Sequence, residues 1–231
     1  MQKIRVVIMD GDGTIFGGVR RSIAVFCRLL ALRGVKITPC LYQAAALQWG
    51  SKLIRLREEF FPHIPESEIL KIYAEMRPHV KIVSYPGMRE TLAFMRDCGI
   101  SLNMQTSRTS VGARRSLGEN GLREYLNRLI CLEDVGYAYA KPSPRGLNMI
   151  LEDLARHGVS PDEAVYVGDS LYADMPCAAA ADIAFIAVHE ENIVPRQAWI
   201  DHGVREENVL RSFRDVPARL GLLPGSRLRL L

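Results

Sequence analysis

The sequence lacks the spaced cysteine and histidine pairs that a structural metal site or a disulfide framework requires. None of its five cysteines forms a C-x-x-C pair, and its five histidines show no ligand spacing. The pattern therefore gives no support to a zinc site or to a small domain held by disulfides. We expect buried free thiols in a reducing compartment. The cysteines are Cys27, Cys40, Cys98, Cys131 and Cys177.

Long apolar runs and runs of basic residues are absent as well. The chain begins MQKIRVVIM and turns acidic at Asp10, so this apolar segment is too short for a membrane span and lacks the features of a cleaved leader. Lys and Arg are scattered, the net charge is only +4, and no basic stretch is interleaved with aromatic residues as in a nucleic-acid groove. We expect a cytoplasmic protein with neither a membrane nor a nucleic acid as its partner. The sequence leaves its oligomeric state open.

The composition is that of a globular enzyme, with 48% hydrophobic and 24% charged residues, and one stretch stands out. In residues 4–16, IRVVIMDGDGTIF, an apolar run rich in β-branched residues stops at two aspartates, which is typical of a buried strand followed by a reactive loop. Asp10 and Asp12 are two residues apart at the end of an extended segment, so both carboxylates can point to the same side. They would repel each other unless a cation lies between them or one of them stays protonated.

The rest of the chain divides into two patterns. After Gly17 and Gly18, which we interpret as a hinge, residues 20–80 have helical spacing, a helix break at Gly50 and no convincing strand. From Tyr85 onward helix and strand alternate, which is typical of a doubly wound parallel sheet in an α/β protein. We predict strands at 100–105, 128–132, 164–167 and 184–188, a core formed by residues 1–16 and 83–231, and an inserted helical cap at 17–82.

Polar residues follow the predicted strands, and the carboxyl ends of parallel strands meet at one edge of a sheet. Thr106 ends the second strand, and Lys141 lies in the loop after the third. Asp169 ends the fourth strand, with Asp174 five residues later. So many carboxylates at one edge call for a hard divalent cation, and Mg²⁺ suits a site of few carboxylates, water and a substrate phosphate. The Lys141 ammonium would lie next to the remaining phosphate oxygens.

Four short motifs, in this order, resemble those of the haloacid dehalogenase (HAD) superfamily of phosphohydrolases. The motifs are D-x-D-G-T at residues 10–14, a hydroxyl residue at Thr106 with Ser107 after it, Lys141-Pro142, and G-D-x-x-x-x-D from Gly168 to Asp174. The resemblance covers residues 1–188. It implies a HAD-like α/β core with a C1-type helical cap at 17–82, as in phosphoglycolate phosphatases and β-phosphoglucomutases.

The resemblance also implies a role for each motif residue. Asp10 would attack the phosphoryl group and form an aspartyl phosphate. Asp12 would protonate the leaving oxygen and then take a proton from the hydrolytic water. Thr106 and Ser107 would bind phosphate oxygens, and Lys141 would stabilise the charge of the transition state.

The implied cofactor is Mg²⁺. It would be held by Asp10, Asp169 and the backbone carbonyl of Asp12, and Asp174 would orient these ligands. We therefore expect a Mg²⁺-dependent phosphatase that hydrolyses a small phosphomonoester, because a helical cap that closes over the site would exclude bulky substrates. Its partner would be a small phosphorylated metabolite.

Taken singly, the motifs have plainer interpretations. D-G-D-G-T could be a tight turn or part of a calcium loop, although no Glu closes such a loop here. Lys141 could be a solvated loop lysine, and Asp174 could be a helix N-terminal acid favoured by the helix dipole. The strand of the second motif carries Asn103 and Gln105 on one face, which is unusual for a strand buried on both faces. Its position or register is therefore open, and Ser107 could take the role of the threonine.

The cap contains basic and aromatic residues whose function the sequence leaves open. A solvated face is the favoured interpretation of the basic residues and the helical core that of the aromatic ones, although one or two cations could reach an anionic substrate. The basic residues are Arg20, Arg21, Lys52, Arg55 and Arg57, and the aromatic ones are Trp49, Phe60 and Phe61.

Two other functions stay open. A β-phosphoglucomutase-like phosphomutase would use the same aspartates, but caps of that type place a histidine soon after the hinge, and the first histidine here is His63. A regulatory or binding protein on the same fold would not need the complete catalytic set that is present. A dehalogenase needs only one aspartate of the pair and a phosphonatase departs from D-x-D-G-T, so Asp12 argues against both.

Overall fold

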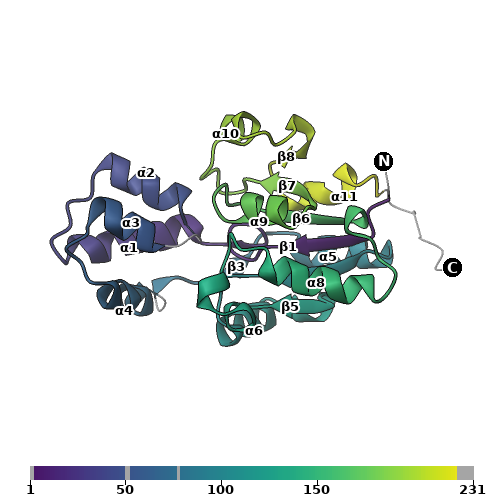
Figure 1. The fold of residues 1–231 in the computed structure, drawn as a ribbon, viewed down its shortest axis with the longest axis horizontal. Coiled ribbons are helices and arrows are strands. Elements are labelled where there is room, and N and C mark those ends of the chain that lie inside the picture. Colours follow the sequence, from purple (N-terminus) through teal and green to yellow (C-terminus); the bar gives the residue numbers. More distant parts are fainter. Residues whose placement is uncertain (1–2, 50–52, 77–78, 223–231) are drawn as a thin grey trace.

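The computed structural model describes residues 3–49, 53–76 and 79–222, which form a helical part and an α/β part (Figure 1). The helical part comes from residues 19–76 and lies at one end of the elongated molecule, beyond the sheet. The predicted helix break at Gly50 and the side chains of Lys52 and Arg55 lie outside the described residues. The division into a core at 1–16 and 83–231 and a cap at 17–82 stays a prediction. The term cap is used below for the helical part.

A six-stranded parallel sheet organises the described α/β part. Its strands are β1 (Val6–Met9), β4 (Ser101–Gln105), β5 (Arg128–Ile130), β6 (Ala164–Gly168), β7 (Ala184–Val188) and β8 (Val209–Leu210). Their order is β5–β4–β1–β6–β7–β8, and every neighbouring pair is parallel. This arrangement confirms the predicted doubly wound α/β fold class.

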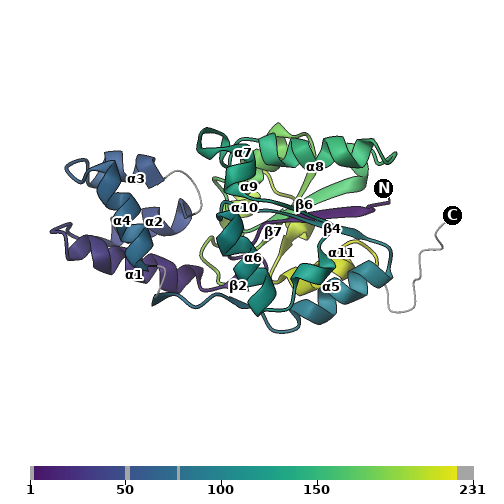
Figure 2. The same cartoon turned by 90° about the horizontal axis from the view of Figure 1, so that it is seen from below.

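Helices cover both faces of the sheet (Figure 2). On one face lie α5 (Met88–Asp97), α6 (Ser110–Glu119) and α11 (Val216–Arg219), and on the other lie α8 (Arg145–Ala155) and α9 (Asp174–Ala180). Alternate residues of β1 separate the two cores, because Val7 and Met9 pack on the first face whereas Val6 and Ile8 pack on the second. Burial on both faces explains why the strand sequences are apolar without alternation.

The strand order reverses at β1, which places the motif residues together. β4 pairs with one edge of β1 and β6 pairs with the other. A crevice forms at such a point, beyond the carboxyl ends of the strands, because the two connections leave in opposite directions. Asp10 directly follows β1, Thr106 follows β4, and Asp169 follows β6.

The described part of the cap contains α1 (Val19–Ala31), α2 (Pro39–Leu47), α3 (Leu53–Phe60) and α4 (Glu66–Met76). Local signals fix these helices. Thr38 caps α2 by accepting the Leu41 N–H at 3.1 Å, and Pro39 occupies the first turn. Glu66 and Glu68 lie in the first turn of α4, where the helix dipole favours them. The apolar faces close on a core that is separate from the cores of the sheet.

A second, two-stranded sheet joins the two parts. β2 (Phe16–Gly17) pairs antiparallel with β3 (Val83–Ser84), where the chain enters and leaves the cap. Gly18 has φ 108°, and a Cβ there would lie 3.3 Å from the Lys81 carbonyl oxygen. Glycine is required here because other residues rarely adopt this backbone conformation. Gly18 thus turns the chain from β2 directly into α1.

The polar residues of β4 do not place it at the edge of the sheet. β4 is an internal strand, paired with both β1 and β5, and the side chains of Asn103 and Gln105 are buried. Gln105 packs against Gly146 of α8, where a Cβ would lie 2.6 Å from Gln105 Nε2. Gly146 of α8 therefore leaves room for the Gln105 side chain. This explains how an internal strand can carry a polar residue toward a covering helix.

Other expectations need correction. Cys40 is exposed, because the buried positions of α2 are Leu41 and Ala45 and Cys40 lies outside them. The sequence does not predict β8, α7 (Leu132–Val135) or α10 (Arg196–Asp201), because such short elements show no clear periodicity. Near the end of the described chain, a 3₁₀ turn at Phe213–Asp215 precedes α11. In the described part of the chain, no helix combines the length and apolar composition needed to cross a membrane.

Candidate active site

The end of β1 places Asp10 in the interior. Its backbone N–H donates to the Val167 carbonyl at 2.9 Å, which extends the pairing of β1 with β6 by one residue. The following loop turns tightly, because the Gly11 carbonyl accepts the N–H groups of Ile15 and Phe16 at 3.0 and 2.9 Å. The Asp10 side chain is buried at the start of this loop.

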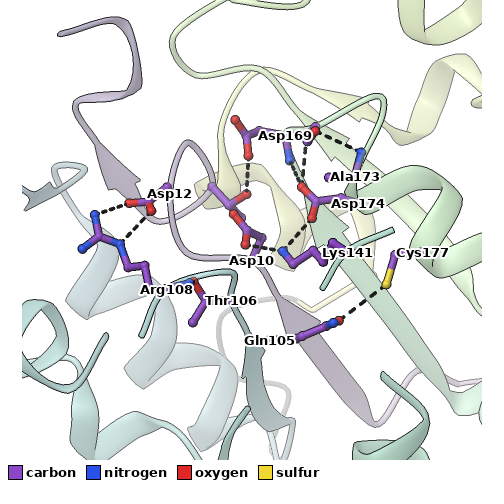
Figure 3. Close-up of polar contacts among 12 residues, drawn as sticks. Asp10, Asp12, Gln105, Thr106, Arg108, Lys141, Asp169, Ala173, Asp174 and Cys177 are labelled. Carbon is purple, nitrogen blue, oxygen red and sulfur yellow. Dashed lines mark hydrogen bonds and ion pairs between the residues drawn. The ribbon is translucent and has the colours of Figure 1, made fainter. Parts of the chain in front are cut away.

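Lys141 lies between two buried carboxylates (Figure 3). Its Nζ donates to Asp10 Oδ1 and, at 2.7 Å, to Asp174 Oδ1. Burial lowers the pKa of Lys141, but the charges of Asp10 and Asp174 outweigh it and raise this pKa above its usual value. Lys141 is therefore a buried, charged partner of Asp10, and the interpretation as a solvated loop lysine is wrong.

Each carboxylate oxygen of Asp174 accepts two hydrogen bonds. Its Oδ1 accepts from Lys141 at 2.7 Å and from the Tyr166 hydroxyl at 3.0 Å. Its Oδ2 accepts the backbone N–H groups of Asp169 and Ser170 at 3.1 and 3.0 Å. Asp174 begins α9, but these bonds run to the preceding loop and to Lys141. The carboxylate thus holds the loop that carries Asp169 in place.

Asp169 is held from the opposite side by the first motif. Thr14 Oγ1 donates to Asp169 Oδ1 at 3.3 Å. Gly13 has φ +83°, and a Cβ there would lie 1.8 Å from Asp169 Oδ2. The glycine of D-x-D-G-T therefore serves the backbone turn and also leaves space for a carboxylate contributed by β6.

The described residues include a carboxylate cluster that fits a hard divalent cation. Oxygens of Asp10, Asp169 and Asp174 lie within 4.8 Å of one another. Burial raises the pKa of Asp10 to about 7, and the charges of Asp174 and Asp12 add to this rise while Lys141 opposes it. Burial and the charges of Asp10 and Asp174 also raise the pKa of Asp169 well above its usual range. A bound cation would relieve this repulsion through oxygen ligands of the preferred kind.

Thr106 and Ser107 line the same cavity as the carboxylates and Lys141. The cavity has a volume of about 390 Å³ when its open side is included. Thr106 Oγ1 accepts the backbone N–H of Arg108 at 3.2 Å, which leaves the hydroxyl hydrogen free to donate. Both predicted phosphate ligands therefore lie where they can face a phosphate beside Asp10.

Arg108 is a residue of this site that the sequence analysis missed. Its Nε and Nη2 donate to the two oxygens of Asp12 at 2.7 and 2.8 Å (Figure 3). The two residues are 96 positions apart in the chain, so local spacing contains no signal for the pair. The only available hint is that Arg108 directly follows the hydroxyl motif at 106–107.

The cap contributes Trp49 to the cavity. Trp49 lines it together with the residues of the core, and its ring is stacked on Tyr73 with centroids 6.0 Å apart. Burial and the Asp12 charge raise the pKa of the Tyr73 hydroxyl. Trp49 also packs against the cap core, as do Phe60 and Phe61, which agrees with the prediction that these aromatic residues belong to the helical core.

Three of the five basic residues considered in the sequence have described side chains, and these bond mainly to backbone carbonyls. Arg20 donates to the carbonyls of Glu191 and Asn192 at 2.6 and 3.0 Å. Arg21 donates to the His79 carbonyl at 3.0 Å, and Arg57 donates to two carbonyls of the loop between α3 and α4. These arginines stabilise the cap and its junction with the core.

The match to known proteins agrees with this geometry. Residues 7–188 match the haloacid dehalogenase-like hydrolase family. The chain belongs to this family. This match confirms the resemblance that was predicted from the four motifs. The predicted similarity to phosphoglycolate phosphatases is confirmed as well, because such enzymes are among the similar proteins.

The similar haloacid dehalogenase-like proteins include several phosphatases. The chain is 26% identical to a phosphoglycolate phosphatase of Agrobacterium fabrum, and the match covers 72% of both chains. It is 30% identical to a phosphoglycolate phosphatase of Vibrio vulnificus over 73% of this chain and 77% of the relative. It is 32% identical to a glyceraldehyde 3-phosphate phosphatase of Methanopyrus kandleri, but that match covers only 45% of this chain and 42% of the relative.

Solved structures show the same fold. A protein from Bacteroides fragilis described as a haloacid dehalogenase-like hydrolase superimposes with a TM-score of 0.75 at 20% identity, covering 93% of this chain and 100% of the other. A protein from Thermotoga maritima described as a β-phosphoglucomutase gives a TM-score of 0.66 at 22% identity, covering 96% and 100%. The fold, including the helical part, is thus shared by phosphatase-like and mutase-like members.

Proposed function

We propose that this haloacid dehalogenase-like hydrolase is a Mg²⁺-dependent phosphatase that hydrolyses a small phosphomonoester through an aspartyl phosphate. The observation that carries the proposal is the meeting of Asp10, Lys141 and Asp169 in one cavity with the hydroxyl residues at 106–107. The phosphatases among the similar proteins support the same reaction class. Asp10, Asp169 and the backbone carbonyl of Asp12 would hold the Mg²⁺, which when bound would neutralise charge on the transferring phosphoryl group.

The remaining chemistry belongs to the side chains. A carboxylate oxygen of Asp10 forms a bond to phosphorus while the ester P–O bond breaks, and Asp12 gives a proton to the departing oxygen. Asp12 then takes a proton from water, whose oxygen attacks phosphorus and releases phosphate and the Asp10 carboxylate. Lys141 stabilises the phosphoryl oxygens and orients Asp10, and Thr106 with Ser107 donates to the other oxygens.

The cap side of the cavity supports a small organic substrate. Trp49 lies across from the phosphate-binding residues, so the leaving group would contact its ring. The cavity is lined by residues of the core and by Trp49 of the cap, which favours a metabolite over a folded phosphoprotein. Phosphoglycolate and glyceraldehyde 3-phosphate are the first esters to test, because similar proteins are named for them.

The test is phosphate release by purified protein from a panel of phosphorylated metabolites, with Mg²⁺ and with EDTA. We expect turnover that requires Mg²⁺ and that falls at least about 1,000-fold in Asp10→Asn, because the nucleophile is lost. Asp153→Asn, which changes a surface aspartate paired with Arg128, is the matched control and should keep full activity. Glucose 1-phosphate in the panel, with isomerisation measured beside hydrolysis, tests a phosphomutase. Absence of phosphate release from the whole panel, or full activity of Asp10→Asn, would refute the proposal.

A further inference from the structure

The contact between Arg108 and Asp12 joins the two loops that carry the first and second motifs. Both carboxylate oxygens of Asp12 accept from one guanidinium, at 2.7 and 2.8 Å. A planar guanidinium that binds a carboxylate through two parallel bonds fixes the direction of the carboxylate, which a lysine ammonium cannot do. Figure 3 shows the Asp12 side chain turned toward Arg108, beside the buried group formed by Asp10 and Lys141.

Arg108 is itself fixed at three points. Its Nη1 donates to Ser116 Oγ of α6 at 3.2 Å, and its backbone N–H donates to Thr106 Oγ1 at 3.2 Å. Its carbonyl accepts the Leu132 N–H at 3.0 Å. The guanidinium is therefore a rigid support, unlike the exposed pair of Arg115 and Glu119 on the same helix, whose side chains are 77% and 56% exposed.

Asp12 needs such a support because its own surroundings leave it free to turn. Its side chain is 32% exposed, compared with 10% for Asp10. A group that transfers a proton must lie within hydrogen-bond reach of the reacting oxygen, and a displacement of about 1 Å can cost about 100-fold in rate. Arg108 uses one acceptor position on each Asp12 oxygen, and a carboxylate has about four, so positions remain to accept a proton from water and to carry the proton that is given to the leaving oxygen.

We propose that Arg108 is a positioning residue that holds the Asp12 carboxylate in the orientation needed for proton transfer to the leaving group and from water. The inference rests on the proposed phosphatase function. It predicts a specific signature: loss of Arg108 impairs the step in which Asp12 protonates the leaving oxygen, and that step matters for an alkyl leaving group far more than for p-nitrophenolate, which leaves without protonation.

The experiment compares kcat/KM for an alkyl phosphomonoester and for p-nitrophenyl phosphate in wild type, Arg108→Ala, Arg108→Lys and Asp12→Asn, because kcat/KM reports the steps up to the aspartyl phosphate and leaves out its hydrolysis, which both esters share. We expect kcat/KM of Arg108→Ala to fall about 100-fold for the alkyl ester and less than about 5-fold for the aryl ester. Arg108→Lys should recover only part of the loss, because it cannot form both bonds. Added guanidinium chloride at non-denaturing concentration should partly restore Arg108→Ala. Asp12→Asn should show the same selectivity with a larger loss.

Controls separate this role from a general loss of structure. Arg115→Ala, which changes an exposed arginine of α6, should match wild type for both esters. Circular dichroism and thermal melts report whether each variant is folded, and Arg108→Gln replaces Arg108→Ala if the alanine variant is not. Equal losses of kcat/KM for both esters, or an unchanged kcat/KM in a folded variant, would overturn the positioning role while leaving the phosphatase proposal intact. A wild type that hydrolyses neither ester would overturn both.

Discussion

At the scale of single residues, Asp169 and Asp174 of the G-D-x-x-x-x-D motif differ in their burial and hydrogen bonds, and this difference suits them to different roles. Asp174 is buried and its two oxygens already accept four hydrogen bonds, so it has little capacity left for a metal. Asp169 is only partly buried, and Thr14 is its side-chain donor among the described contacts. The geometry therefore supports Asp169 as a metal ligand and Asp174 as the residue that orients it, which is the division that the family resemblance implies.

The space left by Gly13 can be tested directly. We predict that Gly13→Ala displaces the Asp169 carboxylate, because the new Cβ would lie 1.8 Å from its Oδ2. Phosphatase activity should fall at least about 100-fold, and the Mg²⁺ concentration for half-maximal activity should rise. Gly34→Ala is the matched control, since Gly34 also has a positive φ, +81°, but no atom within 4 Å of an added Cβ. If both variants lose activity equally, backbone strain and not the contact with Asp169 is the cause.

At the scale of elements, the main strands and most helices could be predicted because apolar runs and turn residues mark them locally. Asp10 and Asp169 could be predicted for the same reason, since each directly follows an apolar strand, whereas Lys141 lies beyond α7 and was indicated by its Lys-Pro motif. Arg108, Trp49 and Glu191 could not, because their roles depend on partners far away in the sequence. The strands β2 and β3 could not be predicted from the sequence either, because a strand of two residues shows no periodicity.

The junction between the parts depends on one such contact. Glu191, in the loop after β7, accepts the backbone N–H groups of Gly18, Val19 and Arg20 at 2.6, 3.1 and 2.7 Å. These are the first N–H groups of α1, which have no partner inside the helix, and the negative charge also suits the helix dipole. The Tyr85 hydroxyl donates to the same carboxylate at 3.1 Å. A core loop thereby fixes the first turn of the cap.

We predict that Glu191→Gln loosens this first turn. One acceptor oxygen and the charge are lost, which should reduce local stability by about 1–2 kcal/mol. Hydrogen–deuterium exchange of the amides at 18–20 should then accelerate by roughly 5- to 30-fold relative to wild type. Glu206→Gln, which changes an exposed glutamate paired with Arg196, should leave these amides unchanged. Unaltered exchange in Glu191→Gln would show that the carboxylate is not what holds α1.

At the scale of the whole molecule, the active site carries an excess of negative charge, whereas the chain as a whole carries a net positive charge. The chain carries a net charge of +4. In contrast, the site brings together the carboxylates of Asp10, Asp169 and Asp174 within 4.8 Å, with Lys141 as the buried cation bonded to two of them. Repulsion among these carboxylates therefore lowers the free energy of unfolding when no metal is bound, and a bound cation should raise it again.

The burial of Asp10 among other carboxylates should make the free energy of unfolding depend on pH. Burial raises the pKa of Asp10 from 3.8 to about 7 on folding, so the folded chain binds more protons than the unfolded chain between these values. The contribution of Asp10 to stability must then fall as pH rises from about 4 to about 7. Asp10→Asn has no such proton to lose. In EDTA, the free energy of unfolding of this variant relative to wild type should therefore rise by about 2 kcal/mol between pH 5 and pH 7.

Urea unfolding at pH 5, 6 and 7 measures this difference, and comparing two variants at each pH cancels the titration of carboxylates remote from the site. The proposed Mg²⁺ ligands include the Asp10 carboxylate, so Mg²⁺ should compete with the proton there and stabilise wild type more at pH 7 than at pH 5. The same Mg²⁺ should have a smaller effect on Asp10→Asn, because one charged ligand is missing. A difference between the variants that stays constant from pH 5 to pH 7 would mean that Asp10 is already ionised in the metal-free protein, and that Lys141 alone compensates its burial.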